Sequence, residues 1–213
     1  MKNNEKKEKR VLSKAEQKRL ERFEGIAEEL AEQGYARHDL TINIKKANVF
    51  AILLMIPLFL IGYGAFYRVH GTLGFGGFNM WFFLIGFVVL IVVHELIHGV
   101  FWSIFTPRHF GDIEFGIMMP SMNPYCACLV PLKKGQYLLG AVMPLVLLGI
   151  LPMIAGIAAG NTNVLFLGIV MTDAAAGDIM IVNRLLGYRS NAGEITYMDH
   201  PTEAGGVVFE KAG

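Results

Sequence analysis

Four long apolar segments set the main constraint on how this chain can fold. They cover residues 47–67, 79–105, 136–159 and 164–186, and each can supply the roughly 20 helical residues that cross a hydrocarbon core. Of the 213 residues, 54% are hydrophobic and only 17% are charged, a balance that is rare in a soluble domain of this size. We therefore expect an all-α membrane protein with about four transmembrane helices. Pro144 and Pro152 would kink the third helix unless neighbouring groups compensate.

Charged residues are concentrated at the two ends of the chain and in one central loop. Lysine and arginine residues lie before the first apolar segment, between the second and third, and at or after the end of the fourth (Lys45, Lys46, Arg108, Lys133, Lys134, Arg184 and Arg189). The positive-inside tendency then places both termini in the cytoplasm. We expect a cytoplasmic N-terminal helix and lead-in over residues 1–44, a four-span membrane domain over 45–187 and a cytoplasmic tail over 188–213.

The N-terminal part has the pattern of an amphipathic helix. Ser13 and Glu16 have the spacing of a capping box, and apolar side chains from Leu20 to Leu30 recur with helical spacing. This predicts a helix of roughly five turns that packs on the membrane surface or on the rest of the protein, with a dedicated partner-binding role as the alternative. The alternation over residues 40–44 indicates a short strand or an extended lead into the first span.

The second apolar segment contains the run His94-Glu95-Leu96-Ile97-His98. On a helix, positions i and i+4 share a face with Cβ atoms about 5–6 Å apart, so His94 and His98 can hold one zinc ion. Glu95 would take a proton from the zinc-bound water and hand it to the leaving amine. The same short pattern also occurs by chance in helices without a metal. Within residues 80–105, however, these three side chains are the only ionisable ones, and a carboxylate near the bilayer centre costs about 2.5–3.5 kcal/mol, which favours a bound partner.

A catalytic zinc ion normally has three protein ligands, so a third must come from elsewhere. The fourth apolar segment offers Asp173 and Asp178. Counting about 1.5 Å per residue from the cytoplasmic ends places His98 about 10 Å and Asp178 about 12 Å deep, with His94 at about 16 Å and Asp173 at about 20 Å. Depth favours Asp178 as the ligand and leaves Asp173 as the alternative. The other carboxylate could orient a histidine through its second ring nitrogen.

The central loop, residues 111–132, is apolar but interrupted by prolines, which favours an extended hairpin over another span. Its exposed backbone groups could pair with an unfolded substrate segment by strand addition, or the hairpin could be a lid or packing loop. Cys126 and Cys128 would lie on one face of a strand. We expect them to be reduced apolar side chains rather than a metal or redox pair.

The chain resembles the Putative zincin peptidase family of small bacterial membrane proteins in four features that follow one another in the same order. They are the His94–His98 helix, the segment 140–144, the Gly177-Asp178 pair and the tail 199–205. The chain is more distantly similar to the site-2 intramembrane metalloproteases. The resemblance covers most of the chain from residue 45 onward and implies a bacterial membrane enzyme, with zinc held by His94, His98 and a later aspartate. The site-2 proteases carry that aspartate in an Asn-Pro…Asp-Gly motif that this chain lacks, so the resemblance supports the metal more than the identity of its third ligand.

We therefore expect a zinc metalloprotease that hydrolyses peptide bonds in transmembrane or juxtamembrane segments, with a membrane protein or peptide as substrate, the lipid bilayer as surroundings and no nucleic-acid partner. Asn123, Asn183 and His109 are candidates, by residue type alone, for a donor to the developing oxyanion. One alternative is a non-catalytic membrane scaffold with a structural zinc site, which would have no use for Glu95. Another is a small ion transporter, which the absence of a detectable internal repeat disfavours.

Overall fold

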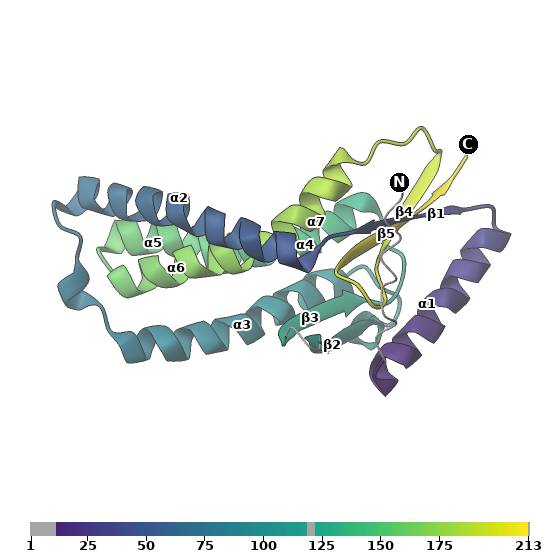
Figure 1. Ribbon diagram of the computed structural model, residues 1–213, viewed down its shortest axis with the longest axis horizontal. Helices are drawn as coiled ribbons and strands as arrows, with labels where there is room; N and C mark the ends of the chain where they lie inside the picture. Colours follow the sequence, from purple (N-terminus) through teal and green to yellow (C-terminus); the bar gives the residue numbers. More distant parts are fainter. Residues whose placement is uncertain (1–11, 119–121, 213) are drawn as a thin grey trace, which may run out of the picture.

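The computed structural model describes residues 12–118 and 122–212. Apolar helices form one end of the molecule, and the first helix and two small sheets form the other (Figure 1). The helices are α1 (Lys14–Glu32), α2 (Ile44–His70), α3 (Met80–Ser103), α4 (Lys134–Pro144), α5 (Leu151–Ala159), α6 (Thr162–Ala174) and α7 (Ala176–Gly187), with 3-10 turns η1 (Phe75–Gly77) and η2 (His109–Asp112) and a π-helical segment η3 (Leu145–Ile150). The strands are β1 (Ala36–Thr41), β2 (Ile113–Met118), β3 (Asn123–Cys128), β4 (Glu194–Asp199) and β5 (Gly205–Lys211).

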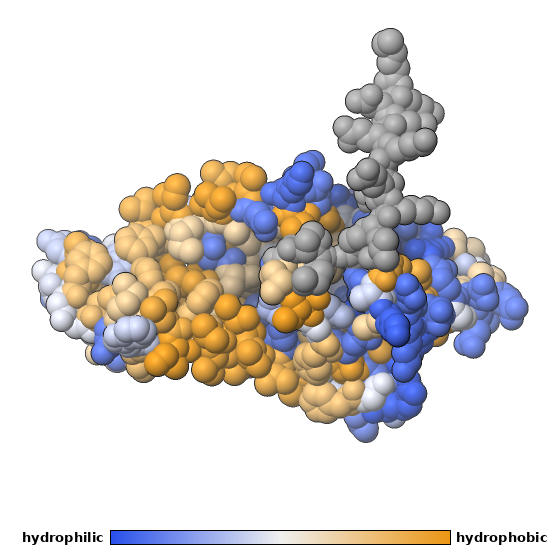
Figure 2. Space-filling view, turned by 60° about the horizontal axis from the view of Figure 1, so that its bottom comes forward, coloured by the Kyte–Doolittle hydropathy of each residue, from blue (hydrophilic) through white to orange (hydrophobic). Residues whose placement is uncertain are grey.

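Three of the predicted spans are present as helices that are long and apolar enough to cross a membrane: α2, α3 and the segment Lys134–Ala159. Asn43 and Asn79 cap the first two, because their side chains accept backbone N–H groups of the first helical turn. Large apolar side chains of α2 and α3 point outward, including Ile52, Leu60 and Trp81. Figure 2 shows a broad hydrophobic surface over the helical end of the molecule, which is the kind of surface that contacts lipid.

The third span does not break at its two prolines. Pro144 ends α4, Pro152 lies in the first turn of α5, and the π-helical segment η3 joins the two helices. The prolines have no backbone N–H to donate, and the wider π-helical turn accommodates the resulting change in the helical hydrogen bonds. The segment therefore continues as one candidate span.

The fourth span differs from the single continuous helix expected over residues 164–186. It consists of α6 and α7, bent by 46°. Ala175 between them has φ −77° and ψ 8°, outside the helical region. The bend leaves Asp178 in the first turn of α7, where unpaired backbone N–H groups and the helix dipole favour a carboxylate.

Helix α1 confirms the prediction for the N-terminal part. Ser13 and Glu16 form both hydrogen bonds of the capping box. Phe23 is buried with Met198, Val207 and Phe209 of the C-terminal strands. The apolar face of α1 therefore packs on the protein itself.

A three-stranded antiparallel sheet corrects the all-α fold class. Its strand order is β1-β5-β4, so the expected C-terminal tail is mostly a hairpin that pairs with the lead-in to the first span. Gly205, at the start of β5, has φ +118°, and a Cβ atom there would lie 2.7 Å from the Leu40 carbonyl oxygen and the Thr41 Cα. Only glycine suits this position, where β5 pairs with the end of β1.

The predicted central hairpin is also present. Strands β2 and β3 pair antiparallel, with Phe115 opposite Cys126 and Gly116 opposite Tyr125. The tip of the hairpin, residues 119–121, lies outside the described residues. Strand β3 lies beside α3 in Figure 1, which brings the hairpin next to the histidine pair.

Candidate metal centre

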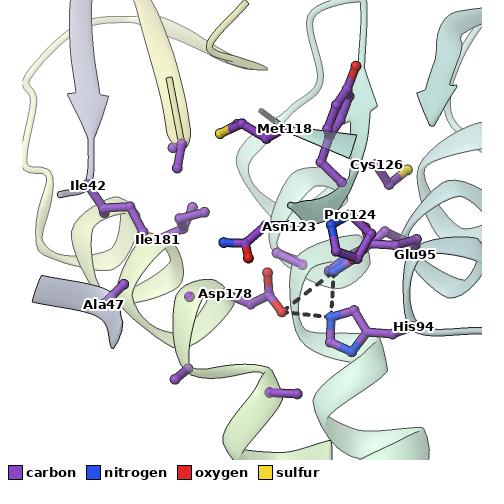
Figure 3. A pocket seen from close by; sticks show the side chains of 18 of the residues that line it. Ile42, Ala47, His94, Glu95, Met118, Asn123, Pro124, Cys126, Asp178 and Ile181 are labelled. Atoms are coloured by element: carbon purple, nitrogen blue, oxygen red, sulfur yellow. Dashed lines mark hydrogen bonds and ion pairs between the residues drawn. The ribbon is translucent and has the colours of Figure 1, made fainter. Parts of the chain in front are cut away.

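His94 and His98 lie one turn apart on α3, and both are buried. Their Nε2 atoms are 3.2 Å apart, and Oδ2 of Asp178 on α7 lies 3.0 Å from Nε2 of His94 and 3.6 Å from Nε2 of His98. Figure 3 shows His94 of α3 and Asp178 of α7 facing each other across the site. One ligand atom from each lies within 4.8 Å of the others, so the group could hold a metal ion.

The donor set fits zinc. Two imidazole nitrogens and one carboxylate oxygen form a common ligand set for a catalytic zinc ion, with a further position open for water or substrate. Nδ1 of His98 is 2.9 Å from the carbonyl oxygen of Gly140. A bond from Nδ1–H to that oxygen leaves the Nε2 lone pair facing His94 and Asp178, the arrangement typical of metal-binding histidines.

The two aspartates of the fourth span have different positions. Asp178 belongs to the group, whereas Asp173 lines the same cavity outside it. The Oδ1 atom of Asp173 is buried without a hydrogen-bond partner among the described residues, as is Nδ1 of His94. The role of Asp178 as a metal ligand stays a prediction, now with a geometry in which it can act.

Glu95 lies beside the group, half-buried at the wall of a cavity of about 430 Å³. The start of α2, strand β3, helices α6 and α7 and the turn between β4 and β5 also line this cavity. The backbone N–H of Cys126 interacts with the Glu95 carboxylate. The carboxylate therefore lies between the histidine pair and the edge of β3, where it can exchange a proton with a molecule in the cavity.

Sequence reasoning did not find the residues that surround His98. The indole of Trp102 stacks on the His98 ring at 5.1 Å between centroids and donates from Nε1 to the Tyr137 carbonyl oxygen at 3.0 Å. The Tyr137 hydroxyl donates to Oδ1 of Asp199, and the Cys128 N–H donates to Oδ2 at 2.7 Å. In the sequence, Asp199 is only one residue of the tail 199–205, and nothing there connects it with α4.

Burial is the main reason for the pKa of Asp199, which is raised to about 6 despite the hydrogen bonds from Tyr137 and Cys128 that stabilise the carboxylate. Burial also raises the thiol pKa of Cys126 and Cys128, that of Cys128 to about 12. Both cysteines are free. Cys128 is part of the hydrophobic core, and Cys126 packs against that core and lines the cavity. They are therefore neutral thiols at neutral pH.

The three residues predicted as oxyanion donors lie in different places, and one further polar side chain, that of His200, reaches the same cavity. Asn123 lines the cavity, whereas Asn183 is exposed at the surface of α7. His109 lies in η2 with Nδ1 at 3.0 Å from the Ser103 carbonyl oxygen. His200 borders the cavity, and its Nδ1 accepts the N–H groups of two residues of its own turn. Of the three predicted oxyanion donors, the structure therefore brings Asn123 to the cavity.

Comparison with curated proteins and with solved structures gives no match. Residues 87–192 match the model of one protein family, described as "Putative zincin peptidase". The matched segment includes His94, Glu95, His98 and Asp178, and it confirms the resemblance found in the sequence. Over these residues, about half of its length, the chain belongs to the family described as Putative zincin peptidase.

Proposed function

We propose that this protein is a membrane-embedded zinc metallopeptidase that hydrolyses peptide bonds in transmembrane or juxtamembrane segments, as the site-2 proteases do. The observation that carries the proposal is the group of His94, His98 and Asp178, with Glu95 beside it at the wall of one cavity. A structural zinc site has no use for an additional carboxylate at that place, so Glu95 favours an enzyme over a scaffold.

In the proposed reaction, His94, His98 and Asp178 hold the zinc ion. When bound, zinc would polarise the scissile carbonyl and bring the pKa of a water molecule toward about 7. Glu95 removes a proton from the attacking water and delivers it to the leaving amine. Asn123 can supply a hydrogen bond to the oxyanion, since it lies at the same cavity.

We favour strand β3 as the place where the substrate backbone binds. Leu129 N–H bonds to the Asp112 carbonyl oxygen, and by the register of the hairpin the backbone groups of Pro124, Cys126 and Cys128 then point away from β2. None of these three residues offers a free N–H group: Cys128 N–H is bonded to Asp199, Cys126 N–H interacts with Glu95, and proline has no N–H. An extended segment would therefore bind mainly through its own N–H groups to the carbonyl groups of Pro124 and Cys126.

The membrane placement belongs to the same proposal. We place the protein in a bacterial cell membrane with both termini cytoplasmic, because the basic residues next to α2 and after α7 favour that side. The metal group then lies near the cytoplasmic ends of α3 and α7. An unwound substrate segment would reach it from that face of the bilayer.

Metal content and hydrolysis of a transmembrane peptide, both measured on detergent-purified protein, test the proposal. We expect about one zinc per chain in the wild type, loss of zinc in His94→Ala and Asp178→Asn, and retention in Asp173→Asn, the matched carboxylate control. Glu95→Gln should keep the zinc and lose hydrolysis. A folded wild type that takes up no zinc after reconstitution would refute the proposal, as would full hydrolysis by Glu95→Gln.

A further inference from the structure

We propose that Tyr137 and Asp199 are positioning residues for the metal centre: the bond between them holds His98 in the orientation in which it binds the metal. The inference rests on the proposed zinc site. It assigns a role to a strand that lies beyond residues 87–192, the segment matched by the family model.

The first step is that both outer contacts of His98 depend on α4. Its Nδ1 lies 2.9 Å from the carbonyl oxygen of Gly140 in α4. Its ring stacks on Trp102, with ring planes 18° apart, and the Trp102 indole is fixed by its bond to the Tyr137 carbonyl oxygen. A displacement of the first turns of α4 would therefore change both contacts that orient the His98 ring.

The second step is that the start of α4 is held by the C-terminal sheet. Tyr137 is 1% exposed, and its hydroxyl donates to Asp199 at the end of β4. Just before α4, Leu132 forms two 2.8 Å backbone hydrogen bonds with Tyr197 of the same strand. These bonds connect α4 to β4 through one side-chain contact and one backbone bridge.

The third step is that Asp199 links this unit to the proposed substrate strand. Its Oδ1 accepts the Tyr137 hydroxyl and its Oδ2 accepts the Cys128 N–H. One carboxylate thus fixes the relative positions of α4, which orients His98, and of β3, which borders Glu95. Partners that orient a metal-binding histidine typically change metal affinity about 10–100-fold when they are altered.

Tyr137→Phe is the primary test, because it keeps the ring that packs against Trp102 and removes only the hydroxyl. Zinc affinity is measured by competition with a chelator, and the geometry of the site by the visible absorption spectrum of the cobalt-substituted protein. We expect zinc affinity about 10–100-fold weaker than in the wild type and an altered cobalt spectrum. Asp199→Asn should act in the same direction. The double variant should lose less affinity than the product of the two single effects, because both changes disturb one bond.

Tyr188→Phe is the matched control. It also removes a tyrosine–carboxylate hydrogen bond, that of the Tyr188 hydroxyl to Glu210 at 2.9 Å. This bond connects the end of α7 to β5 and not α4 to β4, so the variant should leave zinc affinity and the cobalt spectrum unchanged. A folded Tyr137→Phe protein with wild-type affinity and spectrum would overturn this inference and leave the peptidase proposal standing. Wild-type zinc binding without peptide hydrolysis would overturn the proposed activity alone, and the affinity series would still decide the inference. A wild type that binds no metal would overturn both.

Discussion

At the scale of single residues, Gly140 allows α4 to approach the histidine helix. A Cβ atom at this position would meet the indole of Trp102. We expect Gly140→Ala to destabilise the protein by about 1–3 kcal/mol, as overpacking does, and to weaken zinc binding because the Gly140 carbonyl oxygen orients His98. Thermal unfolding in detergent, with and without zinc, measures both effects.

Gly135 is the control for this prediction, since it lies on the same helix and a Cβ atom there would meet nothing within 4 Å. Gly135→Ala should be neutral or stabilising by up to about 1 kcal/mol. Equal losses of stability in the two variants would mean that the cost at Gly140 comes from the helix backbone and not from the contact with Trp102.

Asp199 gives a prediction for pH dependence. Burial raises its pKa to about 6 in the folded protein, whereas the pKa of an aspartate in an unfolded chain is about 4. Between about pH 4 and 6 the folded state therefore holds a proton that the unfolded state releases, so the free energy of unfolding falls as pH rises through this window. Relative to Asp199→Asn, the wild type should lose stability from pH 4 to 6 and then level off.

Thermal midpoints of the two proteins across this range provide the measurement. Groups such as Asp112 and Glu210, whose pKa values are lowered, titrate in both proteins and cancel in the difference. Parallel pH profiles would contradict the raised pKa of Asp199.

At the scale of elements, Arg19 connects α1 to the hairpin and to the C-terminal turn. Its buried guanidinium pairs with Glu114 of β2 at 2.8 Å, bonds to the Pro201 carbonyl oxygen at 2.5 Å and lies over the ring of Tyr125 of β3. We expect Arg19→Gln to cost about 1–3 kcal/mol, because it leaves buried acceptors without their charged donor. Amide hydrogen exchange in β2 and β3 should become faster.

Arg37→Gln serves as the comparison for Arg19. Arg37 also pairs with two carboxylates, those of Glu24 and Asp39, but these side chains are 47% and 48% exposed, and such surface pairs contribute at most about 1 kcal/mol. Hydrogen exchange in the hairpin should not change in this variant. If Arg19→Gln also leaves it unchanged, α1 does not hold the hairpin in place.

Some helices and strands could be predicted from the sequence, and others could not. Helix α1, the three long helices and the hairpin β2–β3 depend on local signals, namely a capping box, apolar length and prolines between short apolar runs. The sheet was missed because Ala36 pairs with Glu210, a partner far along the chain, and the register of such strands depends on the rest of the fold. The bend at Ala175 was missed because no proline marks it.

Part of the candidate metal site could also be predicted from the sequence, and part of it could not. The spacing of His94 and His98 follows from helix geometry, so the sequence could place these side chains on one face. A straight-helix count of depth could only favour Asp178 over Asp173, because their positions depend on how α6 and α7 pack and bend. Trp102, Tyr137 and Asp199 could not be connected with His98, since each is an ordinary residue until the fold brings it there.

At the scale of the whole molecule, the sheet limits the number of membrane crossings. Strand β1 precedes α2, strand β5 follows α7, and the two strands pair, so both lie on one side of the membrane. If α2, α3 and the segment Lys134–Ala159 each cross once, they alone would put β1 and β5 on opposite sides. We therefore predict that the bent pair α6–α7 completes a fourth crossing and that β1 and β5 face the same compartment.

Single cysteines, labelled with a membrane-impermeant maleimide in a background with Cys126 and Cys128 replaced by alanine, test this arrangement. Thr72, Gln33 and Asn191 are exposed, the first between α2 and α3 and the other two beside the sheet. We expect Thr72→Cys to react in intact cells and Gln33→Cys and Asn191→Cys to react only after permeabilisation. Reaction of Gln33→Cys and Asn191→Cys from opposite sides would contradict the four crossings. Reaction of both in intact cells, with Thr72→Cys protected, would keep the four crossings but reverse the orientation and move the metal group to the outer face.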